Sequence, residues 1–216
     1  TNFICIEDYN KIYKKNNPEE TAKHKNFYAP NGEKILMHIS NFRKVKRIED
    51  VIRIFDKVRK KMPAKLLLIG DGPERTHIER LCRELNTCDD VKLLGKVVNP
   101  EEHLLLADLF LLPSETESFG LAALEAMASH VPVISSNTGG IPEVNIHGVS
   151  GYLSDVGDVD DMAKNAIAIL KDETTLNKFK AQAYQQALKF DIHNILPMYE
   201  LLYDAVAGIK HVEKSI

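Results

Sequence analysis

Glu117 and Glu125, separated by seven residues, are the side chains whose type and spacing could most directly do chemistry. Paired carboxylates act as acid and base in glycoside hydrolases, where they stand roughly 5–9.5 Å apart. These two acids would lie about 12 Å apart along a helix, which disfavours a hydrolytic pair. Their spacing suits one extended ligand that is contacted at both ends. The structural alternative is that Ser114 and Glu117 form a capping box while Glu125 is solvated.

Backbone N–H groups lie between the two acids. The pattern predicts a helix over 119–129 that begins near Ser118 or Phe119, which leaves the N–H groups of Phe119, Gly120 and Leu121 without helical partners. A helix N-terminus attracts anions, by about 0.3–1 kcal/mol when exposed and up to ~2 kcal/mol when partly buried. Gly120 has no side chain to obstruct a phosphate. Taken alone, the segment fits a phosphate site and a capped structural helix equally well.

A run of cations follows an earlier predicted strand over 35–39. Arg43, Lys44, Lys46 and Arg47 occupy four of five consecutive positions. Such runs are commonly solvated surface. Their place at the carboxyl end of a strand, opposite the predicted phosphate site, favours ligands of a diphosphate among them.

Short apolar strands alternate with amphipathic helices along the sequence, and these elements must position the groups named above. The predicted strands cover 35–39, 65–69, 91–94, 109–112, 131–135 and the pair Tyr152-Leu153. This alternation predicts an α/β fold: a Rossmann-like, doubly wound parallel sheet of about six strands with helices on both faces. Such a sheet binds ligands at the carboxyl ends of its strands.

Charge, composition and cysteine count exclude several classes of protein. The 216 residues suit one large domain, and 44% apolar with 27% charged residues is ordinary globular usage. A net charge of −3 argues against a nucleic-acid binder. Three cysteines cannot build a disulfide framework and fit a reducing, cytoplasmic location. The longest apolar run is broken by Asp108, so no membrane span is predicted, and the start without Met or a charged leader indicates a piece of a longer chain.

Several turns of this sequence together resemble the GT-B retaining glycosyltransferases of family 4, over roughly residues 35–200. The matching segments, in family order, are Glu117…Glu125 with Phe119-Gly120 between them, Gly70-Asp71-Gly72-Pro73, Gly95-Lys96-Val97 and Gly139-Gly140-Ile141-Pro142-Glu143. The segment from Ser40 to Arg47 is similar to members of the bacillithiol pathway that transfer N-acetylglucosamine from UDP to L-malate. The resemblance therefore implies a retaining hexosyltransferase.

The resemblance also implies catalytic roles. Glu117 would hold the donor sugar, while Lys46 and Arg43 would neutralise the diphosphate and help UDP to leave. Many members have Gly-Arg where this sequence has Ser40-Asn41. We expect Arg43 to supply the guanidinium that this difference removes.

The same resemblance assigns the nucleotide contacts. Glu125 would hold the ribose hydroxyls, and the backbone at Phe119, Gly120 and Leu121 would meet the sugar and the diphosphate.

Further contacts would come from other turns. The Lys96-Val97 backbone would face the uracil, and Gly70 would help to wall the site. The UDP-sugar would be a substrate, and neither a cofactor nor a metal is expected.

Three segments are expected along the chain. Residues 1–30 would be an interlobe connector with one short helix after Pro18, residues 31–196 the nucleotide-sugar-binding domain, and residues 197–216 a helix packing toward an N-terminal lobe. Family members bind their small acceptor with that lobe, which the sequence does not contain. This chain alone would then bind UDP and transfer nothing. Whether it forms a homo-oligomer stays open.

Two other functions stay open: a nicotinamide-dependent dehydrogenase lobe and a non-catalytic nucleotide-binding domain. The third glycine that a dinucleotide fingerprint needs is absent after Gly70-Asp71-Gly72, which counts against the dehydrogenase. ADP- or GDP-sugars are not separated from UDP-sugars, because the base would be recognised largely by backbone atoms.

Overall fold

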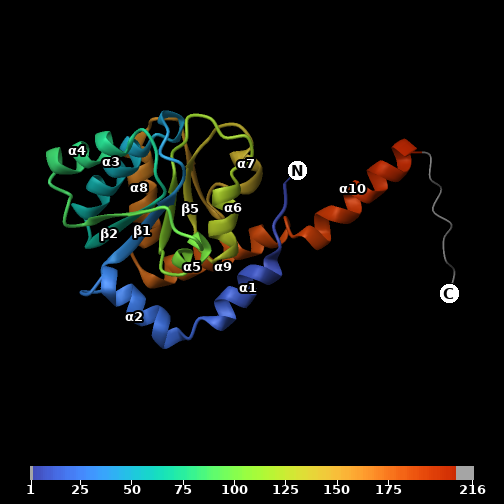
Figure 1. Cartoon of the computed structure of the whole chain (residues 1–216), viewed down its shortest axis with the longest axis horizontal. Helices are drawn as coiled ribbons and strands as arrows, with labels where there is room; N and C mark the ends of the chain where they lie inside the picture. The colour runs from blue at the N-terminus through green and yellow to red at the C-terminus, as the bar shows by residue number, and fades with distance from the viewer. Residues whose placement is uncertain (1, 208–216) are drawn as a thin grey trace.

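The computed structural model describes residues 2–207 and contains one parallel sheet in the order β3-β2-β1-β4-β5-β6 (Figure 1). The six strands are β1 (Lys34–Ile39), β2 (Ala64–Ile69), β3 (Val91–Gly95), β4 (Leu109–Leu112), β5 (Val133–Ser136) and β6 (Gly151–Ser154). The predicted doubly wound sheet is confirmed. The strand order reverses between β1 and β4, so the topological switch point lies between these two central strands.

Helices cover both faces of the sheet. They are α1 (Ile6–Lys15), α2 (Pro18–Tyr28), α3 (Ile48–Arg59), α4 (Arg75–Glu84), α5 (Pro100–Leu104), α6 (Leu121–Ala128), α7 (Ile141–Val144), α8 (Val159–Leu170), α9 (Glu173–Leu188) and α10 (Ile192–Ala207), with a 3-10 turn η1 (Lys44–Lys46). On one face α3 packs against α4 and α8, and on the other α6 packs against α9.

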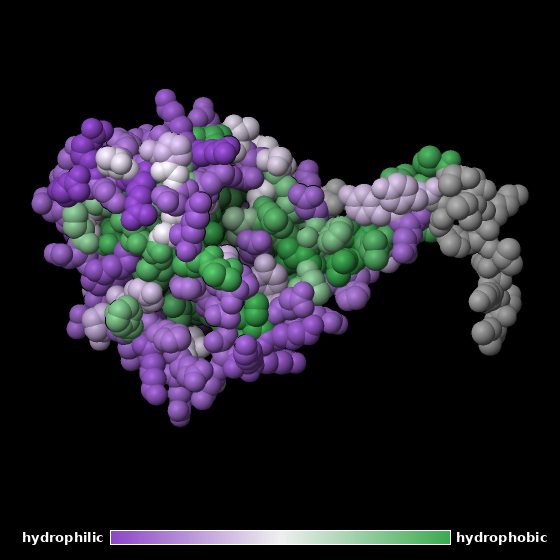
Figure 2. All heavy atoms as spheres, in the orientation of Figure 1, coloured by the Kyte–Doolittle hydropathy of each residue, from purple (hydrophilic) through white to green (hydrophobic). Residues whose placement is uncertain are grey.

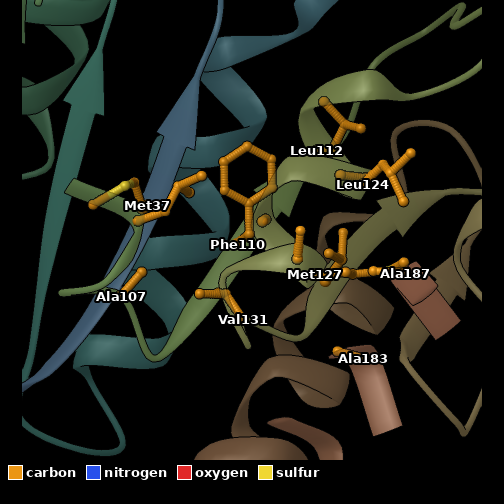
Figure 3. Packing of buried hydrophobic residues seen from close by; sticks show 14 of the residues in the cluster. Met37, Ala107, Phe110, Leu112, Leu124, Met127, Val131, Ala183 and Ala187 are labelled. Carbon is orange, nitrogen blue, oxygen red and sulfur yellow. The ribbon is translucent and has the colours of Figure 1, made fainter. Parts of the chain in front are cut away.

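Alternate strand residues feed two separate apolar cores, because side chains of a strand point to opposite faces of the sheet. Met37 and Phe110 enter one core, where Leu124 and Met127 of α6 pack against them (Figure 3). Leu36 enters the other core, with the apolar faces of α3, α4 and α8. The sheet is thus buried on both sides, which explains why its strands are nearly continuous apolar runs.

The first helices lie against the sheet domain. The helix predicted after Pro18 is α2, whose first turn is capped by the side chain of Asn17 accepting from the Glu19 N–H at 3.0 Å. The sequence analysis missed α1. Tyr184 of α9 donates its hydroxyl to Asn10 of α1 at 3.0 Å, which ties this helix to the domain.

A buried carboxylate joins several elements at the amino end of the central strands. Asp108, 2% exposed, accepts bonds from Lys25 of α2, Lys180 of α9 and the backbone N–H of Ile35 in β1. Burial opposes ionisation, but the two ammonium groups outweigh it and hold the Asp108 pKa below its usual range.

The last helix, α10, projects away from the body of the molecule (Figure 1). It begins at Ile192, five residues before the predicted start, and contains Pro197. Hydrophobic surface lies along part of α10 in Figure 2. The exposed large apolar or aromatic side chains of this helix are Leu196, Met198, Leu201, Leu202, Tyr203 and Val206. Residues 208–216 of the predicted C-terminal segment lie outside the described residues. None of the helices within 2–207 is long and apolar enough to cross a bilayer.

Candidate functional site

The loops that follow β1 and β4 meet at the switch point. The backbone N–H of Glu115 donates to the carbonyl of Val45 at 2.8 Å. Beside this bond, Lys46 Nζ donates to Glu117 Oε2 at 2.6 Å. The structure therefore brings together two residues, 71 positions apart, to which the sequence analysis gave catalytic roles.

The Lys46–Glu117 pair is sheltered but reachable. The Lys46 side chain is 21% exposed and that of Glu117 is 16% exposed. Burying two charges costs free energy of desolvation, which an ion pair offsets only when its geometry is good. Each partner here also neutralises the charge of the other. A second anion near Lys46 would compete with Glu117 for the ammonium group.

Helix α6 presents unpaired donors next to this pair. Among the described residues, no acceptor bonds the backbone N–H groups of Phe119, Gly120, Leu121 or Ala122. The helix begins at Leu121, so the predicted start near Ser118 or Phe119 is wrong by two to three residues. The reason is Gly120, whose φ of +93° lies outside the helical region. The predicted free donors are nevertheless present, and they carry the positive end of the helix dipole.

Glu125 lies on the same helix and is partly buried. Burial raises its pKa, and the nearby carboxylate of Glu101 raises it further. No hydrogen bond or ion pair to its side chain is present within residues 2–207. Tyr9 of α1 is affected by this carboxylate: burial and the charge of Glu125 both raise the pKa of the Tyr9 phenol. Glu125 is therefore partly buried, not fully exposed to solvent.

The capping box of the structural alternative is absent. The Ser114 hydroxyl is fully buried and has no hydrogen-bond partner within the described part of the chain. Glu117 bonds Lys46 and not the backbone of a cap residue.

Glycines let neighbouring turns approach closely. A Cβ on Gly70, whose φ is +126°, would collide with the carbonyl of Ser40, and one on Gly72 would collide with the backbone of Phe42. A Cβ on Gly139, at φ +55°, would likewise collide with the carbonyl of Glu117. These turns support the loops that carry Lys46 and Glu117.

The remaining predicted residues lie further out. Arg43 is exposed, and its side chain has no partner within residues 2–207, whereas Arg47 bonds Asp50 at 2.6 Å and serves the start of α3. Lys96 is exposed in the loop after β3, and Val97 packs against the core below it.

Neither Tyr9 nor His38 was given a role in the site from the sequence. His38 is fully buried in β1, where its ring bonds Leu111 and Ser40. A histidine inside an otherwise apolar strand was the available signal, since such a ring needs hydrogen-bond partners.

Comparison with known proteins places this arrangement in a family. The model of the family described as Glycosyl transferases group 1 matches residues 19–186. The chain belongs to this family. N-acetyl-alpha-D-glucosaminyl L-malate synthase of Bacillus anthracis is 47% identical over 184 residues, which are 85% of this chain and 48% of that protein. The chain thus spans about half the length of this relative.

Solved structures show the same fold. TarM of S. aureus, in a structure with fondaparinux, alpha-GlcNAc-glycerol and UDP, has a TM-score of 0.73 at 26% identity, covering 80% of this chain and 36% of its own. HepE of Anabaena, in complex with UDP, has a TM-score of 0.82 at 20% identity and covers 96% of this chain and 56% of its own. The expected glycosyltransferase fold and family are confirmed.

Proposed function

We propose that this chain is the donor-binding lobe of a retaining glycosyltransferase that moves N-acetylglucosamine from UDP to L-malate. The observation that carries the proposal is the set of unpaired N–H groups at the start of α6, flanked by Lys46 on one side and by two carboxylates. The relative from Bacillus anthracis supports the choice of sugar and acceptor.

The unpaired donors and Lys46 would bind the diphosphate. When the bond between the anomeric carbon and the β-phosphate oxygen breaks, negative charge grows on that phosphate. The N–H groups at Phe119, Gly120 and Leu121 and the ammonium of Lys46 are already fixed around that position, so they stabilise the charge without reorganisation. Arg43, whose side chain has no partner within residues 2–207, would move onto the diphosphate. In this proposal these groups do the work that a metal does elsewhere.

The two carboxylates would grip the donor on either side of the phosphates. Glu117 would exchange Lys46 for hydroxyls of the sugar, and Glu125 would accept the ribose hydroxyls. The uracil would lie against the Lys96-Val97 backbone, and the turn at Gly70 would support the wall. The acceptor would attack from the face that the sugar's leaving group vacates, which retains the anomeric configuration.

The dehydrogenase alternative is disfavoured by the turn after β2. Its glycines do not leave open space for a pyrophosphate, because the backbone of Ser40 and Phe42 occupies the space beside Gly70 and Gly72. A non-catalytic domain that kept the fold would have no need of the sheltered Lys46–Glu117 pair.

Calorimetry with UDP, ADP, GDP and NADH in parallel tests the proposal. We expect UDP to bind and NADH to give no heat of binding. A chain that binds NADH, or that ignores UDP, contradicts the proposal.

The rest of the protein is needed for transfer. We expect this chain by itself to bind UDP and to release none from UDP-N-acetylglucosamine when L-malate is added, since it spans about half the length of the synthase. Chromatographic assay of free UDP checks this, and turnover above the uncatalysed rate contradicts it.

We also propose a cytoplasmic location, which the free cysteines Cys5, Cys82 and Cys88 support.

A further inference from the structure

The two central strands separate at the base of the candidate site. β1 pairs with β4 only at Leu36–Leu109 and Met37–Phe110. Beyond this point β1 stays paired with β2 as far as Ile39, and β4 stays paired with β5. The backbone ladder between β1 and β4 is thus missing at the carboxyl ends of these strands.

The side chain of His38 spans this gap. Its Nδ1 lies 2.8 Å from the carbonyl oxygen of Leu111 in β4, and its Nε2 lies 2.7 Å from the Ser40 hydroxyl at the end of β1. A carbonyl oxygen can only accept, so Nδ1 carries the proton and donates it. In the neutral ring Nε2 is then an acceptor, and the Ser40 hydroxyl must donate to it.

The ring is held neutral. His38 is 0% exposed, and burial lowers its pKa to about 4, with the charge of Lys46 acting in the same direction. One tautomer, with both nitrogens bonded, therefore persists at neutral pH.

We propose that His38 is a positioning residue, which links β4 to the start of the loop carrying Lys46 through its bonds to Leu111 and Ser40. This inference rests on the proposed function, because its purpose is to hold Lys46 at the distance from Glu117 that a diphosphate needs. The loop has two further links to β4's loop, the Val45–Glu115 backbone bond and the Lys46–Glu117 pair. A ligand that displaces Glu117 from Lys46 removes one of these links. In the bound state the position of the loop therefore depends more strongly on the hydrogen bonds of His38. Displacement of a binding group by about 1 Å is enough to weaken its action severely.

Three substitutions divide the link into its parts. In His38→Asn the amide nitrogen can replace Nδ1 and donate to Leu111, but nothing reaches Ser40. In His38→Gln the amide oxygen can replace Nε2 as acceptor for Ser40, but the donor to Leu111 is lost. Ser40→Ala removes the hydroxyl alone and is the mildest change. Thr87→Val is a matched control, because it removes a buried side-chain bond, to the Cys82 carbonyl at 3.2 Å, at the turn before β3.

UDP binding measured by calorimetry, with thermal unfolding of every variant, gives the test. We expect all three substitutions to weaken UDP binding about tenfold, or about 1.4 kcal/mol. Thr87→Val should lower the unfolding temperature without changing UDP affinity. Proton and nitrogen NMR of the wild type should show a His38 resonance of the Nδ1–H tautomer that does not titrate near neutral pH.

A double-mutant cycle with Lys46→Ala separates positioning from general stability. If His38 acts through Lys46, His38→Asn weakens UDP binding about tenfold in the wild type and less than about twofold in the Lys46→Ala background. Equal losses in both backgrounds, or unchanged affinity in all three variants, overturn the positioning role. A wild-type chain that does not bind UDP overturns the proposed function instead, and this outcome is distinct from the others.

Discussion

Lys46 and Glu117 neutralise each other in a sheltered place, and this fixes what each can do when a ligand arrives. In the proposed function the ammonium group changes partner from a carboxylate to a diphosphate, which carries more negative charge and more acceptor oxygens. The carboxylate that it leaves needs new donors, which sugar hydroxyls can supply. Both charges therefore have partners before and after binding, and neither is left buried alone.

Removal of the cation should weaken nucleotide binding strongly. We expect Lys46→Ala to lower UDP affinity more than about tenfold, because a hydrogen bond to a charged group contributes roughly 1.5–3 kcal/mol. Lys44→Ala is the control, since Lys44 is an exposed cation of the same 3-10 turn. By calorimetry the UDP affinity of Lys44→Ala should be close to that of the wild type. Equal losses of UDP affinity in the two variants would contradict a specific contact of Lys46, because they would show only that any positive charge near the site attracts UDP.

Neutralising the acid should separate UDP from the UDP-sugar. In Glu117→Gln the competition for Lys46 is weaker, so UDP should bind about threefold more tightly. UDP-N-acetylglucosamine should bind about tenfold less tightly, because a charged acceptor for the sugar is lost. Glu115→Gln, at an exposed neighbouring acid, serves as the control. Parallel changes for both ligands in Glu117→Gln would contradict contact between Glu117 and the sugar.

Glu125 should make UDP binding sensitive to acid. Its carboxylate must be ionised to accept two ribose hydroxyls, and burial with the charge of Glu101 raises its pKa. UDP affinity should therefore fall as the pH drops through this raised pKa, and the midpoint should move to lower pH in Glu101→Gln. Titrations between about pH 4 and pH 8 would measure both midpoints. An unchanged midpoint in Glu101→Gln would contradict the assignment.

The same group should reduce stability at neutral pH. A carboxyl whose pKa is raised on folding stabilises the folded chain below its ordinary pKa, and this contribution is lost as the pH rises through the raised value. Glu125→Gln should therefore raise the unfolding temperature at pH 7 by about 2–4 °C, for roughly 1 kcal/mol, while it weakens UDP binding. Thermal unfolding at neutral and acidic pH tests the sign, since the gain should vanish in acid.

Several residues of the candidate site could be predicted from the sequence, because their types and turns are local features. The donors at Phe119–Leu121 and the acids on either side of them were found in this way. The helix start was misplaced because Gly120 has a φ of +93°, and a glycine in the sequence does not reveal the sign of its φ, since glycine adopts both. Tyr9 was missed because its proximity to Glu125 is created by the docking of α1.

At the scale of elements, glycines let the loops of the site pack closely against one another. One pair of substitutions tests this. Gly139 and Gly148 both have positive φ, but only a Cβ on Gly139 meets backbone, at Glu117. Gly148→Ala should cost about 1–2 kcal/mol for its backbone conformation alone. Gly139→Ala should cost distinctly more and should also weaken UDP binding, because Glu117 must move. Denaturant unfolding with UDP calorimetry compares them, and equal costs would contradict the stacking.

Element types were largely predictable for the sheet and less so for the first helix. Continuous apolar runs such as β4 are readily found, because both faces of the sheet are buried. Ile6, Tyr9 and Tyr13 recur at helical spacing in α1, but the many polar residues around them concealed the pattern. Packing against α9 and α5 holds this helix in place.

At the scale of the whole molecule, the strand order decides where the site lies. Alternation of strands and helices predicts a parallel sheet, but it does not say which strands are neighbours. The partner of β1 on its second side is β4, and the paired residues Leu36 and Leu109 are 73 positions apart. No local pattern encodes that pairing, so the switch point emerged only from the structure.

That pairing also sets an order of events for a newly made chain. The β1–β2, β2–β3, β4–β5 and β5–β6 contacts join strands that are nearer in sequence, whereas β1–β4 closes the widest loop of the sheet. Closing a wide loop costs more chain entropy, and such contacts slow folding. Two half-sheets with their helices can therefore form before the residues of the candidate site come together. The time at which UDP first binds during refolding would therefore report when the two half-sheets pair.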